Sequence, residues 1–276
     1  GGARSAGPWR ERTPAWRSST WRAPSSSPGS AGGSSTSAAR REKSQNRIFT
    51  WISAISSYTM DLLLAVYLLV ASVDPLVVLF YGEGYISAST IAFDSKHSER
   101  ATHFTGLHSQ EHLSQYVPEN RTFSWGRLEA EVRAAAEGDP HGELARALPA
   151  EARAGGFKPW LKKRLKELMV FLVRSGQDKF LRKPGCFNPL AMDLLIDSAF
   201  DIWILEVNSY PWMSWETQWG RRWMWSLLDE MLDIQLEVAR KQRAGESLAE
   251  LKSPRGWETV INEAAGYSFT EEGSCP

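Results

Sequence analysis

The stretch from Leu62 to Tyr81 is nearly long and apolar enough to cross a membrane, but Asp74 and Pro75 interrupt it. A charged residue at the centre of a transmembrane helix costs roughly 2.5 to 3.5 kcal/mol on insertion scales. Val, Tyr and Leu on both sides of an Asp-Pro turn favour two buried strands instead. We therefore expect a hairpin of strands over residues 64–70 and 76–81, and no membrane partner.

Other segments have the periodicity of helices or strands. The clearest is the segment from Lys158 to Ser175, which places leucines on one face and lysines on the other, as in an amphipathic helix. Helices are expected over residues 127–137, 158–175 and 219–241, and strands over residues 190–196 and 202–208. Between the hairpin and the first helix, residues 85–125 are expected to form a long loop with short elements.

Four tryptophans follow one another at spacings of three and four residues near the start of the last predicted helix: Trp212, Trp215, Trp219 and Trp223. This spacing places them along one helical face. We expect the stripe to pack against the sheet, and a docking face for a protein partner is the alternative.

The first 45 residues differ in character from the rest of the chain. They are rich in Ser, Gly, Pro, Ala and Arg, and they carry eight Lys or Arg against Glu11 and Glu42. Such a segment cannot bury enough apolar area to offset its ordering entropy. We expect a disordered basic tail and no nucleic-acid partner. Because Arg and Trp are interleaved there, a nucleic-acid- or microtubule-binding arm is the alternative.

The most informative stretch runs from Ala191 to Asn208, where two apolar strands are joined by a polar turn. If Asp197 pairs with Ile202, Asp193 lies directly opposite Glu206, and Asn208 shares their face because side chains repeat every second residue. Two carboxylates and an amide oxygen suit Mg²⁺, which prefers hard oxygen ligands. On spacing alone, a solvated sheet end with both carboxylates on its outside is an equal alternative.

Several motifs of this chain resemble those of the tubulin tyrosine ligase-like family. The segment from Cys186 to Asp193, followed thirteen residues later by Glu206-Val207-Asn208-Ser209-Tyr210-Pro211, resembles its Asp-bearing strand and E-V-N-x-x-P motif. Upstream, Asp74-Pro75-Leu76 resembles the D-P-L turn, Glu83-Gly84 the E-G motif, and the segment from His103 to Gly106 the H-x-T-N motif. The resemblance extends from about Leu62 to Trp225.

This resemblance implies an α+β fold, the C-terminal lobe of an ATP-grasp fold, with a mainly antiparallel sheet and helices on one face. It implies that Asp193, Glu206 and Asn208 hold magnesium and ATP. The family activity is ATP-dependent amide-bond formation, in which a carboxylate of tubulin or a similar acidic tail is phosphorylated and then attacked by an amino acid. The implied partners are therefore tubulin or microtubules and an amino-acid co-substrate.

The chain departs from the family pattern at positions that carry basic or polar groups. The first family arginine is replaced by Leu63 or Ala65, depending on the alignment, and the second is replaced by Ser87. Thr59 replaces a lysine, and Gly106 replaces an asparagine. These groups would stabilise charge on the acyl phosphate and hold the acceptor. We therefore assign no catalytic residue and expect this chain alone to be inactive. The alternatives are a non-catalytic tubulin-binding pseudoenzyme and an incomplete fragment of an active ligase.

Three regions are expected along the chain. They are a basic tail over residues 1–45, a partial ATP-grasp domain over residues 46–242 and a C-terminal extension over residues 243–276. The family's nucleotide-binding first half has no counterpart in residues 1–58. Cys186 and Cys275 are far apart and lie in no metal-binding spacing, which favours a reducing compartment. We expect a cytoplasmic protein, with the cytoskeleton or a cilium as narrower locations.

Overall fold

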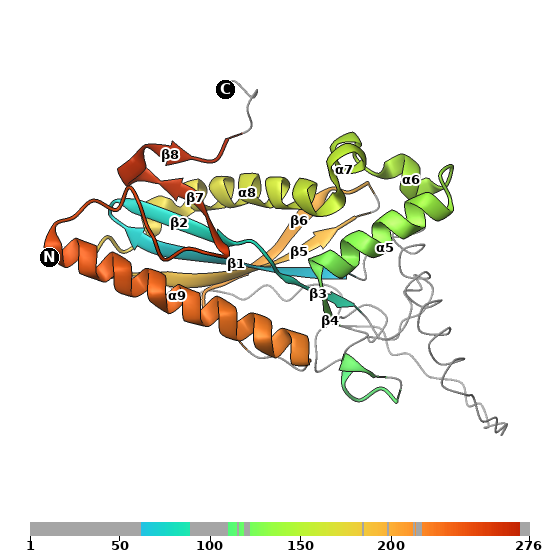
Figure 1. Cartoon of the computed structure of the whole chain (residues 1–276), viewed down its shortest axis with the longest axis horizontal. Helices are drawn as coiled ribbons and strands as arrows, with labels where there is room; N and C mark the ends of the chain where they lie inside the picture. Colours follow the sequence, from blue (N-terminus) through green and yellow to red (C-terminus); the bar gives the residue numbers. More distant parts are fainter. Residues whose placement is uncertain are drawn as a thin grey trace, which may run out of the picture.

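The computed structural model describes residues 62–88, 110–114, 116–118, 122–183, 185–197, 199–211, 213 and 217–270. The predicted disordered tail, residues 1–45, lies outside them. Within these ranges one antiparallel sheet packs against helices (Figure 1). This confirms the predicted α+β class, with the mainly antiparallel sheet expected of the C-terminal lobe of an ATP-grasp fold.

The strands are β1 (Leu62–Val73), β2 (Leu76–Tyr81), β3 (Tyr85–Ala88), β4 (Thr122–Ser124), β5 (Asn188–Ile196), β6 (Ile202–Asn208), β7 (Trp257–Asn262) and β8 (Tyr267–Ser268). The α-helices are α5 (Trp125–Gly138), α6 (Glu143–Ala147), α7 (Ala150–Gly155), α8 (Phe157–Gly176) and α9 (Gln218–Ala244), and two short 3-10 helices span Gln177–Lys179 and Glu263–Ala265. The predicted hairpin, strand pair and three helices are all present, whereas β3, β4, β7, β8, α6 and α7 were not individually predicted.

Strand β1 is the centre of the sheet. Along one edge it pairs first with β3 and then with β2, and along its other edge it pairs with β5. The β1–β2 hairpin turns at Asp74 and Pro75, as predicted. Among the described residues, no helix has both the length and the apolar character needed to span a membrane.

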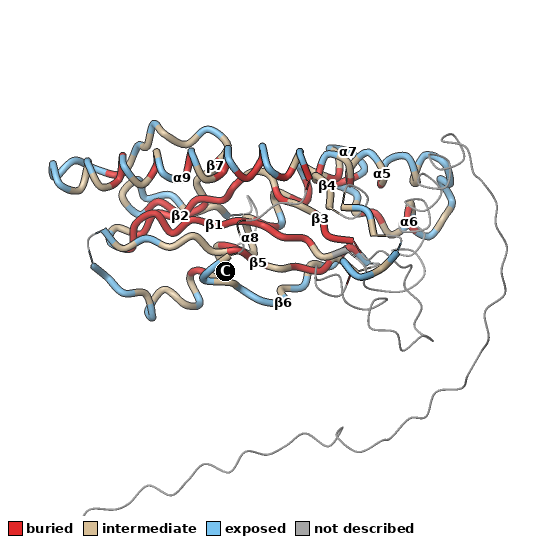
Figure 2. The backbone as a smooth tube through the Cα atoms, turned by 90° about the horizontal axis from the view of Figure 1, so that it is seen from below, coloured by how far each residue is buried: buried red, intermediate tan, exposed pale blue. Residues whose placement is uncertain are grey.

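Helices cover both faces of the sheet, so the prediction that they lie on one face is wrong. On one face Leu64, Val66 and Leu68 of β1 pack in a core with α5 and α8. On the other face the alternate β1 residues, including Tyr67 and Leu69, pack in a second core with α9. Figure 1 shows α8 and α9 on opposite sides of the strands, and Figure 2 shows that β1 and β2 are buried. The cause is visible in the sequence of β1, which is apolar at consecutive rather than alternate positions, as in strands covered on both faces.

Helix α8 is held to the sheet by apolar and ionic contacts. Its inner residues Leu161, Leu165 and Met169 are fully buried, as the predicted amphipathic pattern requires. Nearer its edge, the Nζ atoms of Lys162 and Lys166 each lie 2.5 Å from the carboxylate of Glu258 in β7. The same helix therefore packs on the sheet and is tied to one of its strands.

Helix α9 has clear start and stop signals. The Thr217 hydroxyl accepts a hydrogen bond from the Gly220 N–H at 2.9 Å, which is the usual N-cap arrangement. The helix ends at Gly245, whose φ of 67° is in the left-handed region that glycine adopts readily.

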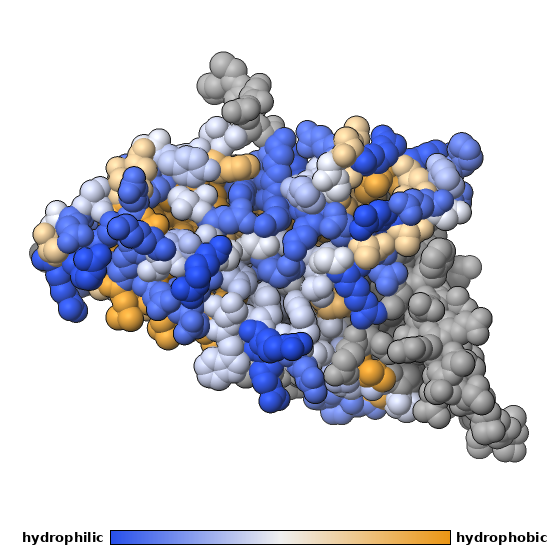
Figure 3. Space-filling view, viewed as in Figure 1, coloured by the Kyte–Doolittle hydropathy of each residue, from blue (hydrophilic) through white to orange (hydrophobic). Residues whose placement is uncertain are grey.

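Hydrophilic residues dominate the surface in Figure 3, and hydrophobic residues show at the lower edge of α9. The exposed apolar residues of this helix are Trp225, Leu232 and Leu236.

Residues 243–276, predicted as a C-terminal extension, contribute two strands to the same sheet. Strand β7 pairs with β2, and β8 pairs with β7. The turn before β7 is anchored to α9 by the buried carboxylate of Glu230, which accepts hydrogen bonds from the backbone N–H groups of Arg255, Gly256 and Trp257. This end of the chain is thus built into the domain.

Candidate functional site

The β5–β6 hairpin brings Asp193 and Glu206 opposite each other, as predicted. The predicted pairing of Asp197 with Ile202 is wrong, because Ile196 pairs with Ile202 instead. The turn is one residue longer than expected: the Asp197 carboxylate accepts hydrogen bonds from the backbone N–H groups of Ala199 at 2.9 Å and Asp201 at 3.0 Å. These bonds hold Asp197 in the turn rather than in the ladder.

A β-bulge at Leu205 restores the register that the longer turn shifts. Residues Leu194 to Ile196 of β5 pair with Ile202 to Ile204 of β6. The next residue of β5, Asp193, pairs with Glu206, so Leu205 has no partner in β5. Without the extra residue Asp193 would face Leu205, and Glu206 would point to the other side of the sheet. The bulge therefore places both carboxylates on one face.

Asn208 completes the cluster. Its Nδ2 lies 3.0 Å from Glu206 Oε1 and 3.4 Å from Asp193 Oδ2, so the amide donates towards both carboxylates. Burial, followed by the hydrogen bond and the like charge of Glu206, raises the pKa of Asp193 to about 6, and the Asn208 donor opposes this rise. The three predicted site residues thus meet at one point of the sheet.

The donor set fits magnesium. Asp193 and Glu206 offer carboxylate oxygens, and a half-turn of the Asn208 amide would present its oxygen in place of its nitrogen. Mg²⁺ usually takes one or two carboxylates and fills its remaining positions with water and phosphate oxygens. Within the described ranges no group of three or more His, Cys, Asp or Glu side chains is placed to hold a metal ion. The role of these three residues as ligands stays a prediction.

One of the departures from the family motifs falls beside the carboxylates. Ala65 lies directly opposite Asp193 in the β1–β5 pair, and Leu63 lies opposite Ser87 in the β1–β3 pair. The groups that shift the pKa of Asp193 include no Lys or Arg side chain among the residues that the structure describes. Thr59 and Gly106 lie outside those residues.

No role was predicted for the tyrosines on this face of the sheet. Tyr67 follows Ala65 by two positions in β1, and Tyr85 lies opposite Ala65 in β3. Since strand side chains alternate between faces, both tyrosines belong to the face that carries Asp193. The two-residue period of β1 would have placed Tyr67 on this face. Tyr85 could be placed there only from the pairing of β3 with β1, which was not predicted.

The Glu83-Gly84 motif has a structural role. A Cβ atom at Gly84 would lie 2.4 Å from the Ala65 carbonyl oxygen and 2.6 Å from the Trp125 ring. Glu83 accepts a hydrogen bond from the Trp125 N–H at 3.2 Å and from Lys158 Nζ at 2.5 Å. The motif thus lets β3 approach β1 closely and ties it to α5 and α8.

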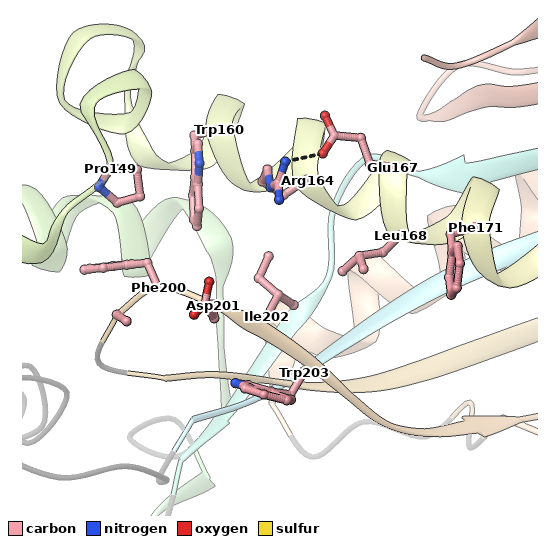
Figure 4. A pocket seen from close by; sticks show the side chains of 11 residues that line it. Pro149, Trp160, Arg164, Glu167, Leu168, Phe171, Phe200, Asp201, Ile202 and Trp203 are labelled. Carbon is pink, nitrogen blue, oxygen red and sulfur yellow. Dashed lines mark hydrogen bonds and ion pairs between the residues drawn. The ribbon is translucent and has the colours of Figure 1, made fainter. Parts of the chain in front are cut away.

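A separate hollow of about 670 Å³ lies between α8 and the β5–β6 turn (Figure 4). Trp160, Phe200 and Trp203 are among its lining residues, together with Arg164 and Glu167, whose side chains form an ion pair at 2.6 Å. Neither Asp193 nor Glu206 lines it. The hollow is therefore distinct from the carboxylate cluster.

Residues 64–244 match the model of the tubulin-tyrosine ligase family, which is more than half of the chain. This chain belongs to the tubulin-tyrosine ligase family. The match includes nearly all of the β1–β2 hairpin, the carboxylate cluster and all of α9, so the resemblance inferred from the motifs is confirmed.

Named relatives of this family member are glycylases. The chain is 27% identical over 215 residues to the protein polyglycylase TTLL10 of Macaca fascicularis, covering 76% of this chain and 32% of that protein. It is 28% identical over 215 residues to the inactive polyglycylase TTLL10 of Homo sapiens, covering 76% and 30%. It is also 23% identical over 152 residues to the human tubulin monoglycylase TTLL3, covering 53% and 18%. The chain spans about a third of the length of the TTLL10 relatives.

Proposed function

We propose that this chain is the magnesium- and ATP-binding part of a ligase that joins an amino acid to tubulin or a similar acidic tail. The observation that supports this most is the convergence of Asp193, Glu206 and Asn208, which depends on the bulge at Leu205. Family membership supplies the reaction class. Such a protein would act in the cytoplasm, at microtubules or in a cilium.

Glycine is the amino acid that the comparisons favour. The relatives include proteins named polyglycylase and tubulin monoglycylase. We extend this to the present chain as the first co-substrate to test, with tubulin as the first acceptor.

The three site residues would hold the metal end of the nucleotide. Bound magnesium would neutralise phosphate charge as it develops during transfer. At neutral pH the Asp193 carboxyl is mainly ionised, since its pKa is about 6, and it can serve as a ligand. Glu206 is exposed and faces Asp193 across the hairpin, where it is accessible to the same ion.

A non-catalytic binding role is the second candidate, and one specific observation favours it. Ala65, opposite Asp193, is only 1% exposed and carries no charge, and Leu63 and Ser87 are also uncharged. A site of this kind can bind a metal ion while lacking groups that stabilise a developing negative charge. On this view the chain retains the metal-binding strand pair without completing ligation.

Metal binding and ligation can be measured separately. The first test titrates Mn²⁺, as a spectroscopic substitute for Mg²⁺, into the chain with and without ATP. Asp193→Ala and Glu206→Ala should each weaken binding at least tenfold, whereas Asp178→Ala, an exposed carboxylate elsewhere, should not. Equal binding by all four proteins would disprove the metal site.

The second test incubates the chain with tubulin, ATP, magnesium and labelled glycine. We expect no incorporation by this chain alone, whether it is a non-catalytic binding module or one part of a larger ligase. Incorporation that Asp193→Ala and Glu206→Ala abolish would instead establish a ligase whose missing basic groups are replaced by other residues.

A further inference from the structure

The hollow between α8 and the β5–β6 turn has largely apolar walls. Figure 4 shows Trp160 and Leu168 pointing from α8 towards Phe200 and Ile202, and these four residues are among those that line the hollow. Phe171, also in its lining, is 70% exposed. Pockets of about 300 to 1,000 Å³ bury most of a small ligand, so a hollow of about 670 Å³ is large enough for several side chains.

The chain that precedes β1 enters the sheet beside this hollow. Leu63 lies opposite Leu195 in the β1–β5 pair, and Leu195 lies opposite Trp203, a lining residue, in the β5–β6 pair. Strand β1 begins at Leu62, so the preceding residues join it at the end of the sheet that carries the β5–β6 turn. Two strand spacings, from β1 to β6, are roughly 10 Å. Three extended residues span about the same distance.

The sequence before β1 has the composition of a buried segment. From Ile48 to Met60 it contains no Asp, Glu, Lys or Arg. Ile48, Trp51, Ile52 and Ile55 follow one another at positions i, i+3, i+4 and i+7, which is the spacing of one helical face. A short connection to β1 gives such an apolar stripe an effective concentration in the millimolar range at a surface within its reach.

We propose that the hollow between α8 and the β5–β6 turn is the docking site for residues 48–58 of the same chain. The apolar stripe of this segment covers the apolar walls of the hollow, and the connection to β1 is long enough for it to do so. The inference is independent of the proposed function, because neither Asp193 nor Glu206 lines the hollow.

Urea unfolding of the full chain is the first measurement. Trp51 is the largest side chain of the stripe, and Trp51→Ala should raise the unfolding equilibrium constant about tenfold, the effect expected when a large buried side chain is lost. Trp21→Ala is the matched control, because it makes the same substitution in the predicted basic tail, and it should leave the constant unchanged. Equal unfolding constants for the two variants would overturn the proposal.

A double-mutant cycle tests the contact itself. Phe171 is largely exposed, so Phe171→Ala can be made without opening the core. Residues in contact give non-additive effects, and we expect Trp51→Ala and Phe171→Ala to couple by about threefold or more in the unfolding equilibrium constant. Leu236→Ala is the control partner, since Leu236 is also 70% exposed but belongs to α9, and its cycle with Trp51→Ala should be additive. Additive effects in the Phe171 cycle would overturn the proposal.

Sedimentation velocity at several protein concentrations tests the other occupant, a second copy of the chain. Docking within one chain predicts that wild type and Phe171→Ala sediment alike at every concentration. Self-association that Phe171→Ala removes and Leu236→Ala retains would assign the hollow to a second copy, and the proposal would then be wrong.

Discussion

Ala65 lies directly opposite Asp193 in the β1–β5 pair and is only 1% exposed. A Lys or Arg at this position would favour the charged form of the carboxyl group and lower its pKa. With alanine there, no Lys or Arg of the described residues is among the groups that shift the pKa of Asp193, and that pKa is raised. The metal-free chain therefore carries a destabilising pair of acids at this point of the sheet.

Asp193→Asn should stabilise the metal-free chain in a pH-dependent way. The folded-state pKa of about 6 lies above the ordinary value of 3.8, so the native state binds this proton more tightly than the unfolded state. Stability from this group is therefore present at low pH and is lost as the pH rises from about 4 to 6. After allowance for partial exposure, the variant should gain about 1 kcal/mol at pH 7.

Urea unfolding between pH 4 and 8 in the presence of a chelator measures this effect. Wild type and Asp193→Asn should converge near pH 4, diverge between about pH 4 and 6, and stay apart by a constant amount above that range. Asp178→Asn, at an exposed carboxylate paired with Lys179, should show no such divergence. Parallel pH profiles of wild type and Asp193→Asn would contradict the raised pKa.

Metal affinity should depend on the same proton. A ligand carboxyl group must be deprotonated to bind a metal ion, and the pKa of Asp193 is about 6. The apparent Mn²⁺ affinity should therefore rise about tenfold between pH 5 and 7. Mn²⁺ titration at the two values, monitored by electron paramagnetic resonance, checks this. A flat profile would mean that Asp193 does not ligate the ion.

The convergence of Asp193 and Glu206 was predictable because a strand repeats its side chains every two residues. The thirteen-residue separation then fixes the pairing once a turn length is assumed. The turn itself was predicted one residue too short, since hydrogen bonds from two backbone N–H groups to the Asp197 carboxylate were not anticipated. The bulge at Leu205 compensated for this error. The correct pairing thus arose from a different geometry than the one assumed.

Other features depended on contacts that a single sequence does not reveal. The helical layers on both faces follow from the consecutive apolar residues of β1, and this signal was available. The short strand β3 depends on the close approach of Gly84 to Ala65, which is a tertiary contact. Strand β7 follows a loop anchored by Glu230 from α9, and this anchor joins residues far apart in the sequence.

Gly84→Ala should destabilise the fold. A Cβ atom there would lie 2.4 Å from the Ala65 carbonyl oxygen, so β3 and β1 must separate. Overpacking of this kind costs about 1 to 3 kcal/mol. Gly176→Ala, at the end of α8 with no atom within 4 Å of the added Cβ, should be neutral or slightly stabilising. Thermal unfolding compares them, and equal melting temperatures for the two variants would argue against the close approach.

Glu230→Ala should detach the C-terminal strands from α9. The Glu230 side chain is 2% exposed, and its Oε1 accepts hydrogen bonds from Gly256 N at 2.6 Å, from Trp257 N at 3.1 Å and from the Arg255 N–H. Loss of this acceptor leaves three backbone donors unpaired or solvated by water, at a cost of about 2 to 4 kcal/mol.

Hydrogen exchange locates the effect of Glu230→Ala. The amides of Gly256 and Trp257 should lose protection, and those of β7 should follow because β7 pairs with β2 directly after this turn. The amides of Lys252 and Ser253 should keep theirs, since they donate to Glu237 at 2.7 to 2.9 Å. Asp229→Ala is the control, because Asp229 is the preceding residue but is exposed and lies 3.6 Å from the Arg255 side chain. Unchanged protection of β7 in Glu230→Ala would mean that pairing with β2 alone holds residues 257–262 and that the Glu230 anchor is not needed for it.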